Sequence, residues 1–210
     1  MGLHKPNLIV LLILVLMFVL LIVSFSSSWY KTSIRGPDHL VSYIQYKYDS
    51  IQNITKSNAT IRIEWNSDQQ MPNAKRIFQL SFAFTIVAWV FTVVNITLIG
   101  FSLGGYLKKI PPCVPINNIV RFLPIGMLIF TLLSVFTFLG LPRAIDQDCW
   151  EHDNFGLLCQ PEEQRDRLVG SLNEGNISWG PIEGWFCCLI SSALSLAATA
   201  VSIISSRYTI

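Results

Sequence analysis

Charged residues are scarce in this sequence: Asp, Glu, Lys and Arg make up 13% of its 210 residues, well below the fraction in an ordinary soluble domain. They are almost absent from four long apolar runs, at 8–25, 77–101, 119–141 and 185–204, where the one charge is Arg121 near an edge. As helices rising about 1.5 Å per residue, runs of this length cross the roughly 30 Å hydrocarbon core of a bilayer. The composition therefore excludes a simple water-soluble domain.

The middle of each apolar run also lacks Asp, Glu, Lys and His. Enzymes and proton-coupled carriers that work inside a membrane need ionisable groups there. We therefore expect a non-enzymatic membrane protein with no catalytic residue, cofactor, metal ion or nucleic-acid partner. A small transporter or channel, or a membrane enzyme with a site between its helices, stays open as the alternative.

The runs predict an all-α membrane protein, in which a bundle of four transmembrane helices carries a small extracellular region with a β-hairpin. We expect a single membrane domain, 1–210. Its predicted segments are, in order, helix 8–28, extracellular loop 29–76, helix 77–101, cytoplasmic loop 102–118, helix 119–141, extracellular loop 142–184, helix 185–205 and cytoplasmic tail 206–210.

The first apolar run raises the question of a signal peptide. Its apolar core is longer than that of a usual signal peptide, and Trp29 and Tyr30 follow it as an interfacial aromatic anchor. We interpret it as a retained helix, with cleavage as the alternative.

Three glycosylation sequons predict the orientation. They begin at Asn53, Asn58 and Asn176, in the two long loops, and such acceptors are useful only on the lumenal or extracellular side. The Lys and Arg count of the first long loop, taken alone, favours the opposite orientation. We give the sequons more weight, and expect a plasma-membrane protein with both termini in the cytoplasm.

Two of the five cysteines, Cys149 and Cys159, share the second long loop at a spacing that a short disulfide closes in an oxidising compartment. Cys113 lies between prolines, beside Lys108 and Lys109, in the connector after the second apolar run. This juxtamembrane position makes Cys113 a candidate for S-palmitoylation, with an inert thiol as the alternative.

The first long loop contains the β-prone segments of the chain. Segment 40–48 is rich in aromatic and β-branched residues, and apolar residues alternate with polar ones in 60–65. Two such segments around the polar stretch 49–59 predict a β-hairpin with a glycosylated tip. A solvated loop without strands is the alternative.

The second long loop begins with an acidic stretch, 144–153. We interpret it as a solvated loop. A weak divalent-metal site around Cys149 is the less favoured alternative, because the spacing is unspecific. Its ligands would be Asp146, Asp148, His152 and Asp153.

Polar and small residues in the apolar runs predict helix packing. Burial of the Asn95 amide in hydrocarbon costs free energy unless the amide is hydrogen-bonded, so we expect it to pair with another helix. The fourth run carries a strip of small residues that suits close packing within the bundle, against other membrane proteins or in self-association. The strip comprises Ser191, Ala193, Ser195, Ala197 and Ala198.

The end of the chain carries one weak partner signal. Its last residue, Ile210, follows Tyr208 and Thr209 in an apolar-x-apolar pattern that some PDZ domains accept at a free C-terminus. A tail that merely ends the helix is the favoured interpretation.

The order of these segments resembles that of the claudin and PMP22-type four-transmembrane proteins. The small-residue run at 22–24 and Trp29 resemble the end of their first helix. Claudins carry a cysteine pair in the first loop, whereas here that loop has Trp65 and no cysteine, and the pair falls in the second loop. The resemblance implies the fold and a general role in adhesion, membrane organisation or as an accessory subunit, with the lipid bilayer and other membrane proteins as partners.

Overall fold

A computed structural model of the chain describes residues 5–35, 41–54, 60–65, 71–104, 116–151, 159, 163–172 and 176–204. The chain divides into two compact units. Unit 1 comprises Met1–Val23, Phe84–Leu133 and Cys187–Ile210, and unit 2 comprises Ser24–Ala83 and Ser134–Phe186.

Four long helices dominate the described residues, and all four are long and apolar enough to cross a membrane. They are α1 (Lys5–Ser26), α2 (Pro72–Leu103), α3 (Ile116–Leu139) and α6 (Glu183–Ile204), and the short helices α4 (Leu141–Glu151) and α5 (Glu163–Asp166) accompany them. The prediction of four long apolar helices is therefore confirmed.

The expectation of a solvated loop at the acidic stretch 144–153 was wrong for most of that stretch. The stretch is not a solvated loop as far as Glu151, because α4 follows α3 after the single residue Gly140. The amide of Gly140 donates to Thr137, and Gly140 in turn accepts from Ala144, so hydrogen bonding continues across the junction. Buried residues recur along α4 at helical spacing, and sequence reasoning missed this pattern because one of them is the acidic Asp148, a residue type that is mostly exposed.

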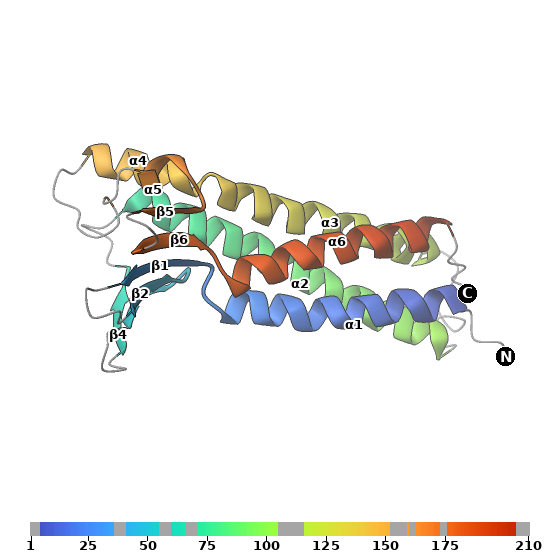
Figure 1. The fold of residues 1–210 in the computed structure, drawn as a ribbon. Helices are drawn as coiled ribbons and strands as arrows, with labels where there is room; N and C mark the ends of the chain where they lie inside the picture. Colours follow the sequence, from blue (N-terminus) through green and yellow to red (C-terminus); the bar gives the residue numbers. More distant parts are fainter. Residues whose placement is uncertain are drawn as a thin grey trace. The chain divides into compact units, whose positions relative to one another are not determined.

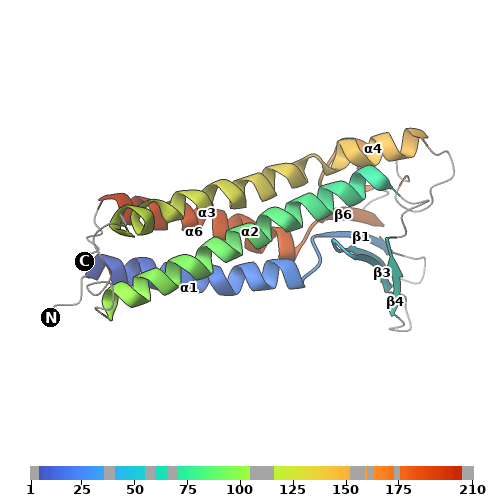
Figure 2. The same cartoon turned by 180° about the vertical axis from the view of Figure 1, so that it is seen from behind.

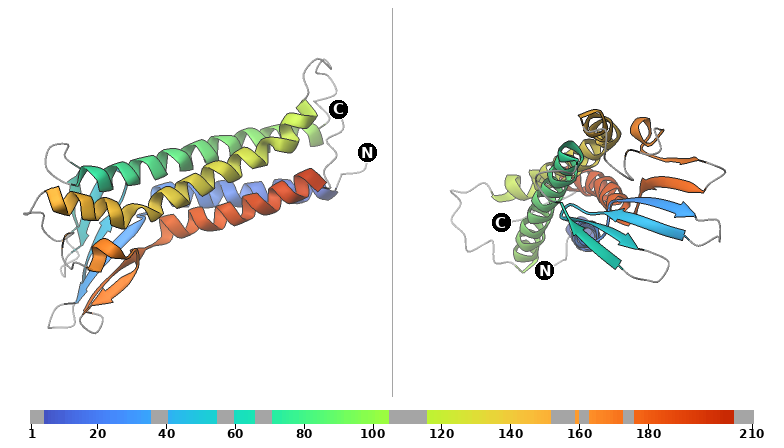
Figure 3. Two further views of the ribbon diagram at one scale, coloured as in Figure 1. Left: turned by 90° about the horizontal axis from the view of Figure 1, so that it is seen from above. Right: turned by 90° about the vertical axis from the view of Figure 1, so that its left-hand side faces the viewer.

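Unit 2 contains an antiparallel sheet of six strands in the order β4-β3-β2-β1-β6-β5 (Figure 2 and the right-hand view of Figure 3). The strands are β1 (Tyr30–Arg35), β2 (Val41–Tyr46), β3 (Ser50–Ile54), β4 (Thr60–Glu64), β5 (Gly170–Leu172) and β6 (Ile177–Pro181). Four strands come from the first long loop and two from the second.

The expected two-stranded hairpin is thus part of a larger sheet. The stretch 49–59, expected as a polar tip, contains β3, in which Asn53 pairs with Ile44 of β2 and Ile61 of β4. Ser50 and Ile51 are buried in this strand. Tertiary burial therefore overrides the polar composition of the stretch, as is common for strands.

Unit 1 consists of segments of the four long helices, which lie side by side (Figure 1). Its buried apolar core is formed by Val10, Leu14, Met17, Ile99, Val120 and Met127. Polar side chains are buried in the same unit, among them Thr85, Thr92, Asn95, Thr131, Ser191, Ser195 and Ser202.

The outward faces of the same helix segments are apolar. Exposed side chains include Leu12, Val19, Val90, Phe122 and Leu196. A soluble monomer rarely exposes contiguous apolar surface on this scale. An apolar exterior around an interior that mixes apolar and polar side chains is the pattern expected of helices that lie in lipid.

Candidate functional site: the sheet of unit 2 and its supports

Strand β1 joins the two long loops, because it pairs with β2 on one side and with β6 on the other. The β1–β6 register runs from Tyr30 opposite Pro181 to Ile34 opposite Ile177. Just beyond it, the amide of Arg35 donates to the backbone oxygen of Asn176 at 2.6 Å. Backbone pairing therefore links the segment after α1 to the segment before α6.

An aromatic cluster supports the sheet. Phe138 on α3 packs at ring-centroid distances of 5.4 to 6.3 Å against Trp29, Tyr30, Phe78 and Trp185. These residues come from the link between α1 and β1, from β1 itself, from the start of α2 and from the start of α6. Aromatic pairs of this kind add roughly 0.5–1.5 kcal/mol each beyond their burial. The cluster thus ties the sheet to three helices.

The end of α1 and the start of α6 meet at very close range within unit 2. Trp29 donates its ring Nε1–H to the carbonyl of Ser24 at 2.7 Å, and the Ser24 hydroxyl donates to the carbonyl of Gly184 at 2.7 Å. The amide of Gly184 donates to Ser28 at 3.0 Å. A Cβ at position 184 would lie 2.5 Å from the Trp29 ring and 2.8 Å from the Ser28 oxygen. Glycine is therefore needed for this approach.

A second chain of bonds leads from α1 to α2 through the turn between β2 and β3. Lys47 donates its ammonium to the carbonyl of Ser26 at 2.6 Å, and so places a positive charge at the C-terminal end of α1. The ring Nε1–H of Trp65 donates to the carbonyl of Lys47 at 2.8 Å. Lys75 of α2 donates to the carbonyl of Trp65 at 3.2 Å. Trp65, which directly follows strand β4, therefore holds the end of that strand near the start of α2.

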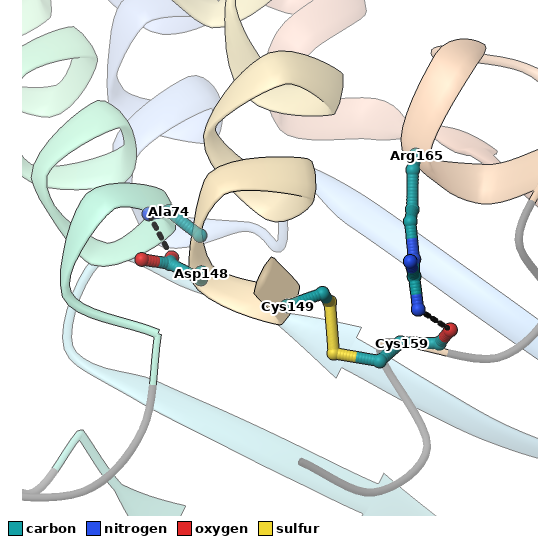
Figure 4. Close-up of a disulfide and its surroundings, with 5 residues drawn as sticks. All are labelled: Ala74, Asp148, Cys149, Cys159 and Arg165. Carbon is teal, nitrogen blue, oxygen red and sulfur yellow. Dashed lines mark hydrogen bonds between the residues drawn. A yellow bond between two sulfur atoms is a disulfide. The ribbon is translucent and has the colours of Figure 1, made fainter. Parts of the chain in front are cut away.

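The expected disulfide between Cys149 and Cys159 is present, with Cα atoms 5.7 Å apart (Figure 4). It connects the end of α4 to the stretch before α5, and both cysteines are buried. Arg165 of α5 donates to the carbonyl of Cys159 at 3.1 Å. The disulfide and this bond together hold α5 against α4.

Asp148 is a site residue whose actual role sequence reasoning missed. Its carboxylate accepts the backbone N–H groups of Asn73 at 3.0 Å and Ala74 at 2.8 Å, at the start of α2 (Figure 4 shows the Ala74 bond). The first N–H groups of a helix have no partner within the helix, and a negative charge there also complements the helix dipole. Asp148 is buried, so solvent does not screen this interaction.

These contacts bear on the metal site that stood as an alternative. Cys149 forms the disulfide, and the Asp148 carboxylate accepts hydrogen bonds from the start of α2. His152 and Asp153 lie outside the described residues. Asp146 lies on another face of α4 from Asp148, because two residues turn a helix by about 200°. Within the described part of the chain, no group of three His, Cys, Asp or Glu side chains is placed to hold a metal ion.

The structure describes two of the three sequons. Asn176 is exposed in the turn before β6, whereas Asn53 is half-buried within β3. Asn58 lies outside the described residues, as do Cys113, the palmitoylation candidate, and the tail that ends at Ile210.

The strands also bury a titratable side chain. Tyr46 at the end of β2 is 1% exposed, and its ring lies 5.9 Å from that of Tyr30. Burial raises the pKa of the Tyr46 phenol far above its usual value, because the charged phenolate would lose its hydration. The Tyr46 hydroxyl is therefore neutral in the folded sheet.

Apolar side chains are also exposed on unit 2. Trp150 at the end of α4 is 77% exposed and Val169 before β5 is 64% exposed, and Ile61 on β4 is more than half exposed. Sequence reasoning did not single out Trp150 or Val169, because an isolated apolar residue in a polar stretch carries no signal of its exposure.

The helix-packing expectations are met in part. Asn95 contacts α3, where its Nδ2 donates to the Met127 sulfur at 3.8 Å. Of the small-residue strip on α6, Ser191 and Ser195 are buried, but Ala193 and Ala197 are exposed. The strip was therefore placed partly on the wrong face, because small residues occur all round this helix.

Comparison with protein-family models and with curated proteins finds no match to this chain.

Proposed function

We propose that this chain is a multi-pass, non-enzymatic membrane protein of the plasma membrane, in which the sheet formed by the two long loops is extracellular and both termini are cytoplasmic. In this proposal unit 2 contacts other membrane proteins, in cell adhesion, membrane organisation or as an accessory subunit.

The pairing of β1 with β6 carries the proposal. A chain that crosses a membrane four times places its first and third connections on one side, and these two connections share a sheet through the Tyr30–Pro181 register. The sequons and the Cys149–Cys159 disulfide favour an oxidising, lumenal side for that sheet. The apolar outward faces of the four helices favour lipid around unit 1.

A claudin or PMP22-type fold is part of the same proposal. It is supported by the element order, in which a helix is followed by four strands, two long and two short helices, two further strands and a last helix. It is also supported by the place of Trp29, which closes the end of α1 through its bond to Ser24. The disulfide in the second loop is the departure from the claudin pattern.

Contact with a protein partner is supported by Trp150. It lies nine residues beyond the apolar run 119–141, or up to about 13 Å along a continuing helix, and thus outside the hydrocarbon core. Exposed tryptophans are frequent energetic centres of protein interfaces. Trp150 shares a helix face with Gln147 and Arg143, both exposed.

The orientation is tested by glycosidase treatment of the protein from intact cells. We expect a mobility shift that Asn176→Gln reduces more than Asn53→Gln does, because Asn176 is exposed in a turn whereas Asn53 lies half-buried in a strand. A tag inserted beside Lys108 should be unreactive from outside. Labelling of that tag on intact cells would show the opposite orientation and contradict the proposal.

The partner role is tested by cross-linking in native membranes followed by co-purification of the full chain. We expect specific cross-linked membrane proteins with the wild type and their loss with Trp150→Ser. Gln147→Ser, one turn earlier on the same exposed face, serves as the matched control and should keep them. Cross-linking that Trp150→Ser leaves unchanged would show that Trp150 does not bind the partner.

A further inference from the structure

Two polar atoms inside unit 1 have no hydrogen-bond partner among the described residues. They are the amide oxygen Oδ1 of Asn95 on α2 and the hydroxyl Oγ of Ser195 on α6. Both residues are 0% exposed. The other end of the Asn95 amide has only a thioether acceptor, the Met127 sulfur at 3.8 Å, which is a weak partner. Buried polar groups are nearly always paired, so both atoms call for an explanation.

The two atoms lie at similar levels of neighbouring helices. The hydroxyl of Thr85 on α2 lies 3.9 Å from the sulfur of Cys188 on α6, which fixes one point of contact. From that point both helices run in the same direction (Figure 1). At a rise of about 1.5 Å per residue, Asn95 lies about 15 Å beyond Thr85 along α2, and Ser195 lies about 10.5 Å beyond Cys188 along α6. The axial offset is therefore about 4.5 Å.

The two polar atoms share no direct hydrogen bond, and a difference in level of this size is within the reach of a single intervening molecule. Two hydrogen bonds of about 2.8 Å through one oxygen span up to roughly 5.6 Å. Asn95 and Ser195 both belong to the buried faces of their helices, which also carry Ile99 on α2 and Ser202 on α6, each 0% exposed. The two side chains thus face the same interior.

Thr92 supplies a third polar group at this place. It is buried, precedes Asn95 by one turn on the same face of α2, and lies about 10.5 Å along from Thr85, level with Ser195. Its hydroxyl donates to the carbonyl of Ala88 at 2.8 Å, and its oxygen lone pairs still accept.

We propose that one water molecule is bound between α2 and α6, where it donates to Asn95 Oδ1 and Thr92 Oγ1 and accepts from the Ser195 hydroxyl. Three bonds are the usual number for a buried water. The ligand class follows from the site: one donor hydroxyl, two acceptor oxygens and no charge. The water satisfies both orphaned atoms at once and joins two helices that are far apart in sequence.

The proposal is tested by thermal unfolding of the purified full chain with Asn95→Leu, Ser195→Ala and the double variant. We expect Ser195→Ala to lower the Tm by about 2–5 °C, since a chain of this size shifts by about 2–4 °C per kcal/mol. We expect the double variant to be no less stable than Asn95→Leu alone, because the water bridge is already lost.

Ser191→Ala is the matched control. Ser191 is equally buried, one turn before Ser195, but its hydroxyl donates to the carbonyl of Cys187 within its own helix at 2.8 Å. We expect its removal to change the Tm by less than Ser195→Ala does. This comparison decides the question even where Asn95→Leu fails to fold.

Three results would overturn the proposal. The first is a higher Tm in Asn95→Leu with no change in Ser195→Ala, which is the behaviour of dry, unpaired groups. The second is an equal loss in Ser191→Ala and Ser195→Ala. The third is an experimental map that resolves other buried waters but shows no density within about 3 Å of both atoms.

Discussion

The contact between Asp148 and the start of α2 predicts a large effect of a single substitution. Asp148→Ala removes the acceptor for two N–H groups, those of Asn73 and Ala74, at a residue that is 1% exposed. Hydrogen bonds to a charged group contribute roughly 1.5–3 kcal/mol each, and loss of a helix N-cap costs about 0.5–2 kcal/mol. Because the two bonds share one carboxylate and water can re-enter, we expect a loss of about 2–4 kcal/mol.

For a chain of this size, that loss corresponds to a fall in Tm of about 5–15 °C, measurable by tryptophan fluorescence of the purified protein. Asp148→Asn keeps one acceptor oxygen and should fall in between. Asp146→Ala is the control, because Asp146 is on the same helix but is partly exposed on another face. An unchanged Tm in Asp148→Ala, or an equal fall in Asp146→Ala, would refute the account of how α4 supports α2.

Three further outcomes are expected. Gly184→Ala should lower the Tm, because the new Cβ would lie 2.8 Å from a backbone oxygen. Gly100→Ala is the control and should leave the Tm unchanged, because nothing lies within 4 Å of a Cβ there. Equal Tm values in the two variants would contradict the close approach at Gly184. Because the pKa of Tyr46 is raised on folding, stability should be complete below about pH 10 and decline above it, and Tyr46→Phe, followed by alkaline unfolding, should flatten that decline. Ser195→Leu should reduce the yield of folded protein on size-exclusion chromatography, whereas Ala197→Leu, two residues on but exposed, should not; the opposite order would reverse the assigned faces of α6.

Local sequence carried the prediction of the long helices and of the disulfide. An apolar run of eighteen or more residues has few structural solutions, so α1, α2, α3 and α6 could be predicted from composition and length alone. Cys149 and Cys159 are ten positions apart, and a loop of that length closes readily, so their pairing was also accessible from the sequence.

The sheet depended on contacts between distant segments. Strand β3 is polar enough to suggest a turn, and it became a strand because β2 and β4 pair with it on both sides. The pairing of β1 with β6 joins residues that are about 150 positions apart, and no local pattern encodes such a register. Asp148 likewise acts on an amide 74 positions away.

Which face of a long helix is buried was also decided by the tertiary structure. In a soluble protein the apolar side of a helix marks its interior face, but here both the interior and the outward face are apolar. The sequence therefore determined that α6 is an apolar helix with small residues, and only packing decided that Ser195 faces inward and Ala197 outward. The physical reason is that, where inside and outside are equally apolar, hydrophobic periodicity no longer distinguishes them.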